Sequence, residues 1–369
     1  MPSQPSPDSY IHAMVWDTGT GDGGNRAVYG LIWSCLVTIF GCTYLAVHPN
    51  LPNRTAKSAR WKRTLRRPIL MLWTIVVPEL MLYCAVIQWA IARNVAKRQA
   101  RKGWTNTHGF FLLMGGFVQG DTLKRLTMDS VGYVDWPDIS VEDIEDKSKG
   151  DGLSKGLLTL QLLWFILQLI SRVVQGFAVT ELELMTVAYV VLAVVMMFFW
   201  WEKPLNVQRP IHIQTRISSK RPEHRQLHDP PILIKWHYYL TGETDDCAAW
   251  SAAEALWQIG IIGAIFGTFF GAIHIIAWNF HFATRGEQLI WRGASIIVTI
   301  APPIYVVYPM IVESFPQRLF RAGHLCHLGL AIIYFLARAF ILIDVFVLLR
   351  DLPASAYQSS DWTQLIPHI

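Results

Sequence analysis

Residues 180–201 read TELELMTVAYVVLAVVMMFFWW, and this stretch decides the fold class. Two glutamates, Glu181 and Glu183, precede a mostly apolar run that is long enough to enter a bilayer, and two tryptophans close it. Tryptophan is enriched where a membrane meets water. Because backbone amides inside lipid must be hydrogen-bonded within their own segment, the run predicts a transmembrane helix.

The rest of the chain repeats this pattern. Of its 369 residues, 52% are hydrophobic and 16% are charged, whereas soluble domains carry about 25% charged residues. A shorter run at 108–118 (HGFFLLMGGFV) fits an interfacial or re-entrant segment. The sequence therefore predicts an all-α polytopic transmembrane helix bundle, with this short segment and about seven spans, at residues 28–47, 69–91, 157–177, 184–201, 259–280, 289–311 and 325–349.

The predicted organisation has three parts. Residues 1–27 are polar and rich in Pro, Ser and Gly, which indicates a flexible lead-in. Residues 28–350 form the bundle, with long loops at 92–156 and 202–258, and residues 351–369 form a C-terminal tail. Seven Lys and Arg residues lie within 48–68 and five within 93–102. These two clusters flank one predicted span, so their charge gives no clear orientation.

Glu79 is the sharpest functional candidate, because ionisable groups at membrane depth cost about 2.5–3.5 kcal/mol each. It lies in the middle of the second predicted span, directly after Pro78, which frees a backbone carbonyl and favours a kink. Tyr83 follows at i+4 on the same helix face. A carboxyl group removed from water can keep its proton near neutral pH, as a general acid must. A structural hydrogen bond between helices is the alternative.

Three further carboxylates and one histidine complete the set of ionisable candidates. Glu181 and Glu183 are two residues apart, so on a helix they face different directions, and one of them suits the helix start. Asp344 in the seventh span and His274 in the fifth are weaker candidates, since each also fits a satisfied interior polar residue. We take Glu79, Glu181, Glu183 and Asp344 as candidate catalytic groups.

A polar stripe on the third predicted span supplies candidate substrate contacts. The stripe consists of Gln161 and the residues 3, 4, 7, 11 and 14 positions after it, the last being Gln175. This spacing places them all on one helix face, which we expect to look into the bundle. Bonding between helices also explains its glutamines. The candidate binding residues are Gln161, Trp164, Phe165, Gln168 and Arg172 from this stripe, with Tyr83, Tyr189 and His274 from other spans.

The sequence gives no sign of a metal or cofactor site. Five cysteines are scattered, four of them inside apolar runs, without the spacing of a zinc site or a disulfide framework. A DDxxD run for metal–diphosphate binding and a DxDD run for protonation in soluble cyclases are both absent. We therefore expect metal-independent chemistry without a cofactor.

Several segments resemble a group of fungal polytopic membrane proteins: LIWSCLVTIFGCTYLAVHPN, HGFFLLMGGF, DKSKGD with SKGLLTLQLLWFILQ, TELELMTVAYV ending in WWEKPL, GEQLIWRGASI and the closing LRDLPASAYQSSDWTQLIPHI. Some members of that group resemble the integral-membrane terpene cyclases of meroterpenoid pathways, of the macrophorin and ascofuranone type. The resemblance covers most of the chain. It implies an acid-initiated isoprenoid cyclase of fungal secondary metabolism, but it does not say which carboxylate acts.

The sequence thus favours a membrane-bound terpene cyclase. We expect Glu79 to protonate an olefin or epoxide of a lipophilic isoprenoid substrate that arrives from the bilayer, aromatic rings to stabilise the carbocation, and a second carboxylate to accept the final proton. The expected partners are this substrate, membrane lipids and other pathway enzymes, not nucleic acid, and the expected location is the endoplasmic reticulum. A transporter or channel, a seven-helix receptor and an accessory scaffold are the alternatives.

Overall fold

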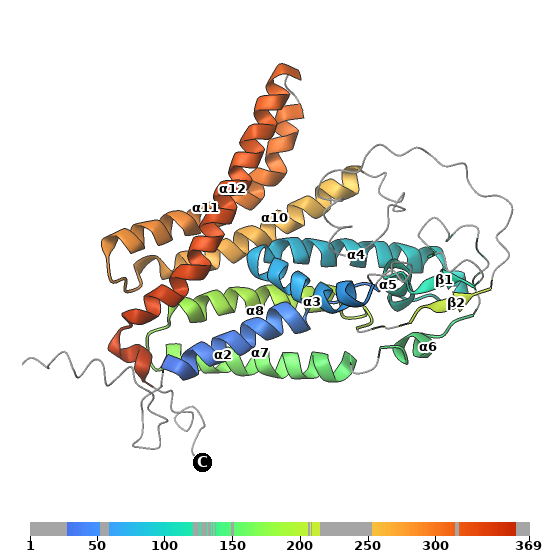
Figure 1. Ribbon diagram of the computed structural model, residues 1–369, viewed down its shortest axis with the longest axis horizontal. Coiled ribbons are helices and arrows are strands. Elements are labelled where there is room, and N and C mark those ends of the chain that lie inside the picture. Colours follow the sequence, from blue (N-terminus) through green and yellow to red (C-terminus); the bar gives the residue numbers. More distant parts are fainter. Residues whose placement is uncertain are drawn as a thin grey trace, which may run out of the picture.

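The computed structural model describes residues 28–51, 59–120, 138–148, 151–205, 209–214, 253–313 and 317–358, together with positions 125, 126, 131, 134, 136 and 207. Helices dominate this part of the chain (Figure 1). The longer ones are α2 (Val28–Phe40, continued by a π-helical turn at Gly41–Leu45), α3 (Ala59–Val76), α4 (Pro78–Arg98), α7 (Asp151–Val174), α8 (Glu181–Phe199), α10 (Ala253–Ile275), α11 (Arg285–Glu313) and α12 (Gln317–Val347). The predicted lead-in at 1–27 lies outside the described residues, as do most of the loop 202–258 and the end of the tail.

The all-α prediction is confirmed, and the number of spans is close to the expected one. Within the described residues, six helices are long and apolar enough to cross a membrane, and the count reaches seven if α3 and α4 are taken together. These two helices are bent by 114° at their junction. The second predicted span is therefore not one continuous helix.

The region predicted as a loop at 92–156 contains several short helices and a strand. It contains the end of α4, a 3-10 turn at Ala100–Lys102, α5 (Asn106–Leu113), β1 (Phe117–Gln119) and α6 (Val141–Glu145), and α7 begins in it. The short run at 108–118 forms α5 and β1, and all side chains of α5 after its first residue are buried. Strand β1 pairs in parallel with β2 (Ile211–Ile213), which joins this region to the segment after α8.

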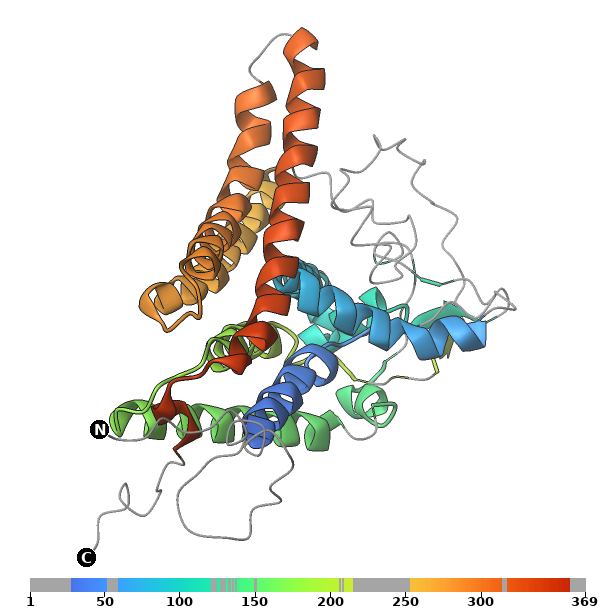
Figure 2. The ribbon, with the colours of Figure 1, turned by 60° about the vertical axis from the view of Figure 1, so that its left-hand side comes forward.

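Large apolar side chains cover the outside of the helices. On α7, Leu153, Leu157, Leu160 and Leu167 are all exposed, at the spacing of one helix face. Such continuous apolar surface is disfavoured in water and suits contact with lipid. Figures 1 and 2 show α2, α7 and α8 side by side, with the distal ends of α11 and α12 projecting away from them.

Glycines allow α10 to pack closely against α4 and α11. A Cβ at Gly267 would lie 2.8 Å from Pro302 of α11 and 3.6 Å from Glu79 of α4, and one at Gly271 would lie 2.5 Å from the backbone of Thr299. Small residues one turn apart let membrane helices approach in this way. This contact places Glu79 between α4, α10 and α12.

Candidate functional site

The junction of α3 and α4 lies at Val77 and Pro78. Proline lacks an amide proton, so it cannot continue a helix, but it suits the first position of a new one. Val77 leaves the helical conformation, with φ −138° and ψ 69°, and α4 begins at Pro78. The expected kink is thus a complete break. It frees the carbonyl groups of Ile75 and Val76 in the membrane-spanning region, where such groups need partners.

Two side chains from distant helices bond these carbonyl groups. The hydroxyl of Tyr189 in α8 donates to Ile75 O at 2.6 Å. Arg338 in α12 donates to Val76 O at 3.3 Å, to Ile75 O at 3.2 Å and to the Tyr189 hydroxyl at 3.3 Å. Its guanidinium also lies 4.3 Å from the centre of the Phe270 ring. Arg338 is only 1% exposed, so it satisfies the carbonyl groups at the helix break from inside the bundle.

Glu79 sits in the first turn of α4, directly after the break. The Tyr334 hydroxyl donates to Glu79 Oε1, and Arg338 interacts with the carboxylate electrostatically. Glu79 Oε2 is buried and accepts no hydrogen bond from the described residues. Glu79 therefore belongs to a buried tyrosine–arginine cluster in which a positive charge compensates the carboxylate.

The predicted contacts Tyr83, Tyr189 and His274 lie around this cluster. Tyr83 is mostly buried against Gly263 of α10. Tyr189 meets Phe270 edge-on, with ring centres 5.5 Å apart, and Phe270 lies 5.0 Å from the His274 ring. His274 Nδ1 bonds Phe270 O at 2.9 Å, and its Nε2 has no hydrogen-bond partner among the described residues. The structure thus brings three predicted residues together with Glu79.

Glu183 stabilises the start of α8. Its Oε2 accepts hydrogen bonds from the Thr180 amide and hydroxyl, both at 3.0 Å, and its own amide bonds Thr180 Oγ1 at 3.2 Å. This reciprocal arrangement is a capping box. Arg172 lies 3.7 Å from Glu183 Oε1. The helix-start role expected for one of the two glutamates therefore belongs to Glu183.

Arg172 ties the C-terminal segment to the bundle. It is 3% exposed, and its guanidinium donates to the backbone carbonyls of Ala178, Ser355, Ala356 and Gln358 at 2.7–3.3 Å. Three of these carbonyls lie in or next to the 3-10 turn Ala354–Tyr357. This buried arginine thus fixes the chain that follows α12.

Glu181 and Asp344 form a second buried cluster. Their residues are 4% and 5% exposed, and the two carboxyl groups interact electrostatically with each other. Glu287 adds a third carboxylate near Asp344 and is bonded by Arg350. Asp344 Oδ2 accepts no hydrogen bond from the described residues, and none of them forms an ion pair with Glu181. Unlike Glu79 and Glu183, this pair has no buried arginine against it in the part of the chain that the structure describes.

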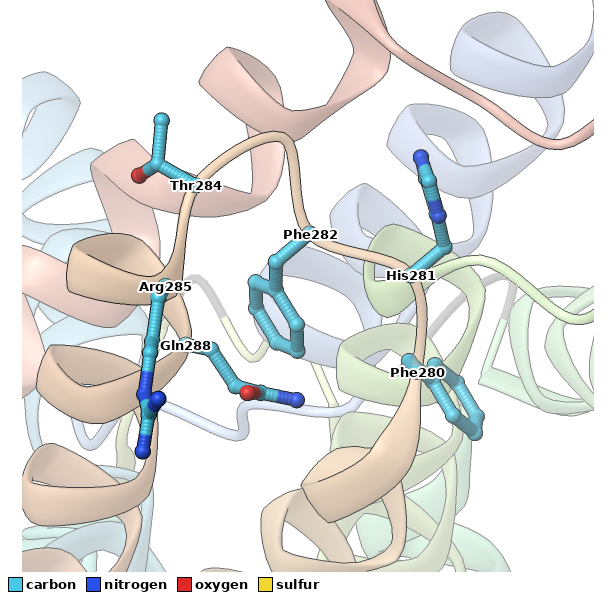
Figure 3. A pocket seen from close by; sticks show the side chains of 6 residues that line it. All are labelled: Phe280, His281, Phe282, Thr284, Arg285 and Gln288. Carbon is cyan, nitrogen blue, oxygen red and sulfur yellow. The ribbon is translucent and has the colours of Figure 1, made fainter.

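An open hollow of about 460 Å³ lies where α10 turns into α11 (Figure 3). The Phe282 ring points into the turn, towards Gln288, and lies 6.1 Å from the ring of Trp291. His281, which borders the hollow, interacts electrostatically with Glu181. The lining residues are Phe280, His281, Phe282, Thr284, Arg285 and Gln288. The hollow therefore combines two phenylalanine rings with polar groups beside the acidic cluster.

The polar stripe on α7 faces the bundle only in part. Phe165 is buried, and Gln161, which donates to Thr38 Oγ1 at 3.0 Å, and Gln168 are partly exposed. Trp164 is 49% exposed on the apolar outer side. The expectation that the whole stripe looks inward is wrong for Trp164, because the helix turns it towards the face that carries Leu160 and Leu167.

The sequence offers Tyr334 as a deep aromatic residue that could line a pocket and Arg338 as a partner for a carboxylate of another helix, but it does not assign Glu287 to a site. Arg338 and Tyr334 are one turn apart on α12, and that spacing is a signal for a shared face. Glu287 lies in the first turn of α11, where an acidic residue is ordinary. Within the described residues, no group of three or more His, Cys, Asp or Glu side chains is placed to hold a metal ion.

The fold and these clusters define a multi-pass α-helical membrane protein with buried carboxylates between its helices. The chain belongs to a family of unknown function, DUF8562, whose sequence model matches residues 9–220. The matched part contains Glu79 and Glu181, whereas Tyr334, Arg338 and Asp344 lie beyond it. No curated protein and no solved structure matches the chain.

Proposed function

We propose that the protein is a membrane-bound, metal-independent terpene cyclase of fungal secondary metabolism, located in the endoplasmic reticulum, and that Glu181 and Asp344 are its acid–base pair. The observation that carries this proposal is the arrangement of the two carboxyl groups: they are buried and interact with each other, and Glu181 also interacts with His281, which borders a hollow lined by two phenylalanine residues. The sequence resemblance supports the same chemistry.

The proposed reaction is an isomerisation. One carboxyl group gives its proton to the terminal olefin or epoxide of a prenylated substrate, and the resulting carbocation is attacked by a second double bond, which closes a ring. The other carboxylate removes a proton from the carbon next to the final cation, and an alkene forms. One proton is given and one is returned, so no oxidant, reductant or metal is consumed.

The surroundings of the four candidate carboxylates support this assignment of the acid–base pair. Glu183 caps a helix and Glu79 lies next to Arg338, whose fixed positive charge would oppose a carbocation. Arg350, which interacts electrostatically with Asp344, donates a hydrogen bond to Glu287. Aromatic faces at the hollow attract a cation by roughly 0.5–2 kcal/mol. In this assignment Glu79 has a structural role, because it holds α4 and α12 together through Tyr334 and Arg338.

The test is turnover by microsomes from yeast that expresses the protein, supplied with prenylated phenols or epoxyfarnesyl compounds in excess chelator. We expect a cyclised product, and we expect Glu181→Gln and Asp344→Asn each to lower its formation at least about 100-fold at unchanged protein level. Glu202→Gln, which alters an exposed carboxylate, is the matched control. Loss of turnover in Glu79→Gln with full turnover in Glu181→Gln would return the acid role to Glu79. Absence of product from every substrate would remove the cyclase proposal.

A transporter is the second candidate, because helices broken inside the membrane form the substrate and ion sites of many transporters. The break at Val77 and its buried Glu79 fit that pattern. Uptake by sealed proteoliposomes of an ion or solute, lost in Glu79→Gln, would favour transport over cyclisation.

A further inference from the structure

The direction of the chain at the α3–α4 junction carries information about membrane topology. The two helices are bent by 114°, and an angle above 90° means that α4 runs back towards the side from which α3 came. A span that is merely kinked continues forward. The question is how deep the junction lies, and at which membrane surface the two outer ends emerge.

The junction lies near the middle of the membrane. Its Ile75 carbonyl accepts a hydrogen bond from Tyr189, which is eight residues after the first residue of α8, Glu181, and ten before the last, Phe199. At a rise of about 1.5 Å per residue, Tyr189 is about 12 Å from one end of that helix and about 15 Å from the other. The apolar part of α3, residues 65–76, is about 18 Å long by the same rise, roughly half of a 30 Å hydrocarbon core.

The outer end of α3 lies where the first span ends. Arg66 donates to Asn50 O at 2.8 Å, and Arg67 donates to Tyr44 O at 3.1 Å. Tyr44 is in the last turn of the first span, and Asn50 follows it. The basic half of α3 therefore reaches the surface at which α2 leaves the membrane.

The outer half of α4 reaches the same surface. Lys203, which follows α8 and is 1% exposed, donates to Gln88 Oε1 of α4 at 2.7 Å and to His48 O at 2.6 Å. Asn106, just beyond α4, donates to Glu202 at 2.6 Å. The middle of α4, the start of α5, the end of α8 and the segment that follows the first span therefore lie together.

We propose that α3 and α4 form a re-entrant hairpin, which enters from one leaflet and returns to it, and that their basic ends bind the anionic lipid headgroups of the cytoplasmic leaflet. The hairpin places on one surface Arg66 and Arg67 of α3 and the five Lys and Arg residues of 93–102. The connections at the opposite ends of the helices, residues 175–180 and 276–284, contain none. Excess Lys and Arg marks the cytoplasmic side, whose anionic lipids attract basic segments.

The contacts of the hairpin explain how a broken helix is tolerated in lipid. Arg338 and Tyr189 bond the Ile75 and Val76 carbonyls freed at the turn, as backbone groups at membrane depth require. Leu65, Ile69 and Leu72 are exposed at i, i+4 and i+7 of α3, which gives this arm an apolar outer face. Arg93 is exposed on α4, one turn after Trp89, and its guanidinium lies 5.1 Å from that ring, a pairing typical of the headgroup region.

Labelling of introduced cysteines in sealed, cytosol-side-out microsomes tests the hairpin, because the native Cys35, Cys42 and Cys84 are buried. In a background with Cys247 and Cys326 replaced by serine, Thr55→Cys and Arg101→Cys flank the pair, and Ala283→Cys marks the opposite surface. We expect a membrane-impermeant maleimide to label both flanking sites without detergent, and Ala283→Cys only after permeabilisation. Labelling of only one flanking site would show a kinked span and overturn the hairpin. Ser58→Cys and Arg98→Cys repeat the comparison should a first variant fail to fold.

Two further readouts test the assignment of the surface. The sequon Asn53-Arg54-Thr55 should carry no glycan, because glycosylation acts on the luminal side, and an endoglycosidase-sensitive band shift lost in Asn53→Gln would overturn the proposal. In nanodiscs, electron paramagnetic resonance of spin-labelled phosphatidylserine and phosphatidylcholine measures which lipid is preferred. Arg93→Glu should lower the preference for phosphatidylserine roughly fivefold, whereas Arg285→Glu, at the other surface, should not. Equal effects of the two variants would refute the lipid contact.

Discussion

Replacing Arg338 by methionine should destabilise the protein by about 3–5 kcal/mol, the usual cost of removing one partner from a buried charge pair. The side chain is 1% exposed, donates to the carbonyls of Ile75 and Val76, and compensates Glu79. Hydrogen bonds of this kind inside membranes average about 0.6 kcal/mol each, so the two carbonyl contacts account for roughly 1 kcal/mol. Most of the loss comes from leaving the Glu79 carboxylate buried without its positive partner.

The assay is reversible unfolding in mixed micelles with increasing denaturing detergent, followed by tryptophan fluorescence. Glu79→Gln in the Arg338→Met background should recover at least about 1 kcal/mol, because both charges are then absent. Arg292→Met is the matched control: Arg292 bonds Trp278 O at 3.0 Å and Asn279 Oδ1 at 3.2 Å near the helix end, and its loss should cost less than about 1 kcal/mol. A cost for Arg338→Met below that of the control, or additive effects in the double variant, would refute the reasoning.

Three other outcomes are expected from the same preparation. Gly267→Ala should cost about 1–3 kcal/mol, because the new Cβ would lie 2.8 Å from Pro302, whereas Gly293→Ala has open space and should be neutral in the same unfolding assay. Burial holds the pKa of His48, which lies outside the spanning segments, well below its ordinary value. The contribution of His48 to the free energy of unfolding should therefore be complete above about pH 6.5 and fall by about 1.4 kcal/mol per pH unit below it. In His48→Gln, the free energy of unfolding should depend less on pH. Arg172→Lys cannot bond four carbonyls, so limited proteolysis should cleave the C-terminal segment faster, and unchanged cleavage would contradict its role as a tether.

The local sequence was sufficient to predict the helices and some of their ends. The run after Thr180 predicts a transmembrane helix because its length and apolar character leave the backbone no other way to satisfy its amides. The spacing of Thr180 and Glu183 is that of a capping box, and the structure forms it. Pro78 signals an interruption, since the physical effect of a proline acts within one turn.

Only the tertiary structure decided which of these residues meet. Tyr334 and Glu79 are 255 positions apart, and Glu181 reaches Asp344 from another helix; a helical pattern fixes the face on which a side chain lies, but not the helix opposite that face. The 114° turn at Val77 has the same origin, because proline permits a break and the direction of the new helix depends on Arg338, Tyr189 and the close contact at Gly267. The sequence by itself thus determined that carboxylates enter the bundle, and the packing of distant helices determined which are neutralised by arginine and which are left as a pair.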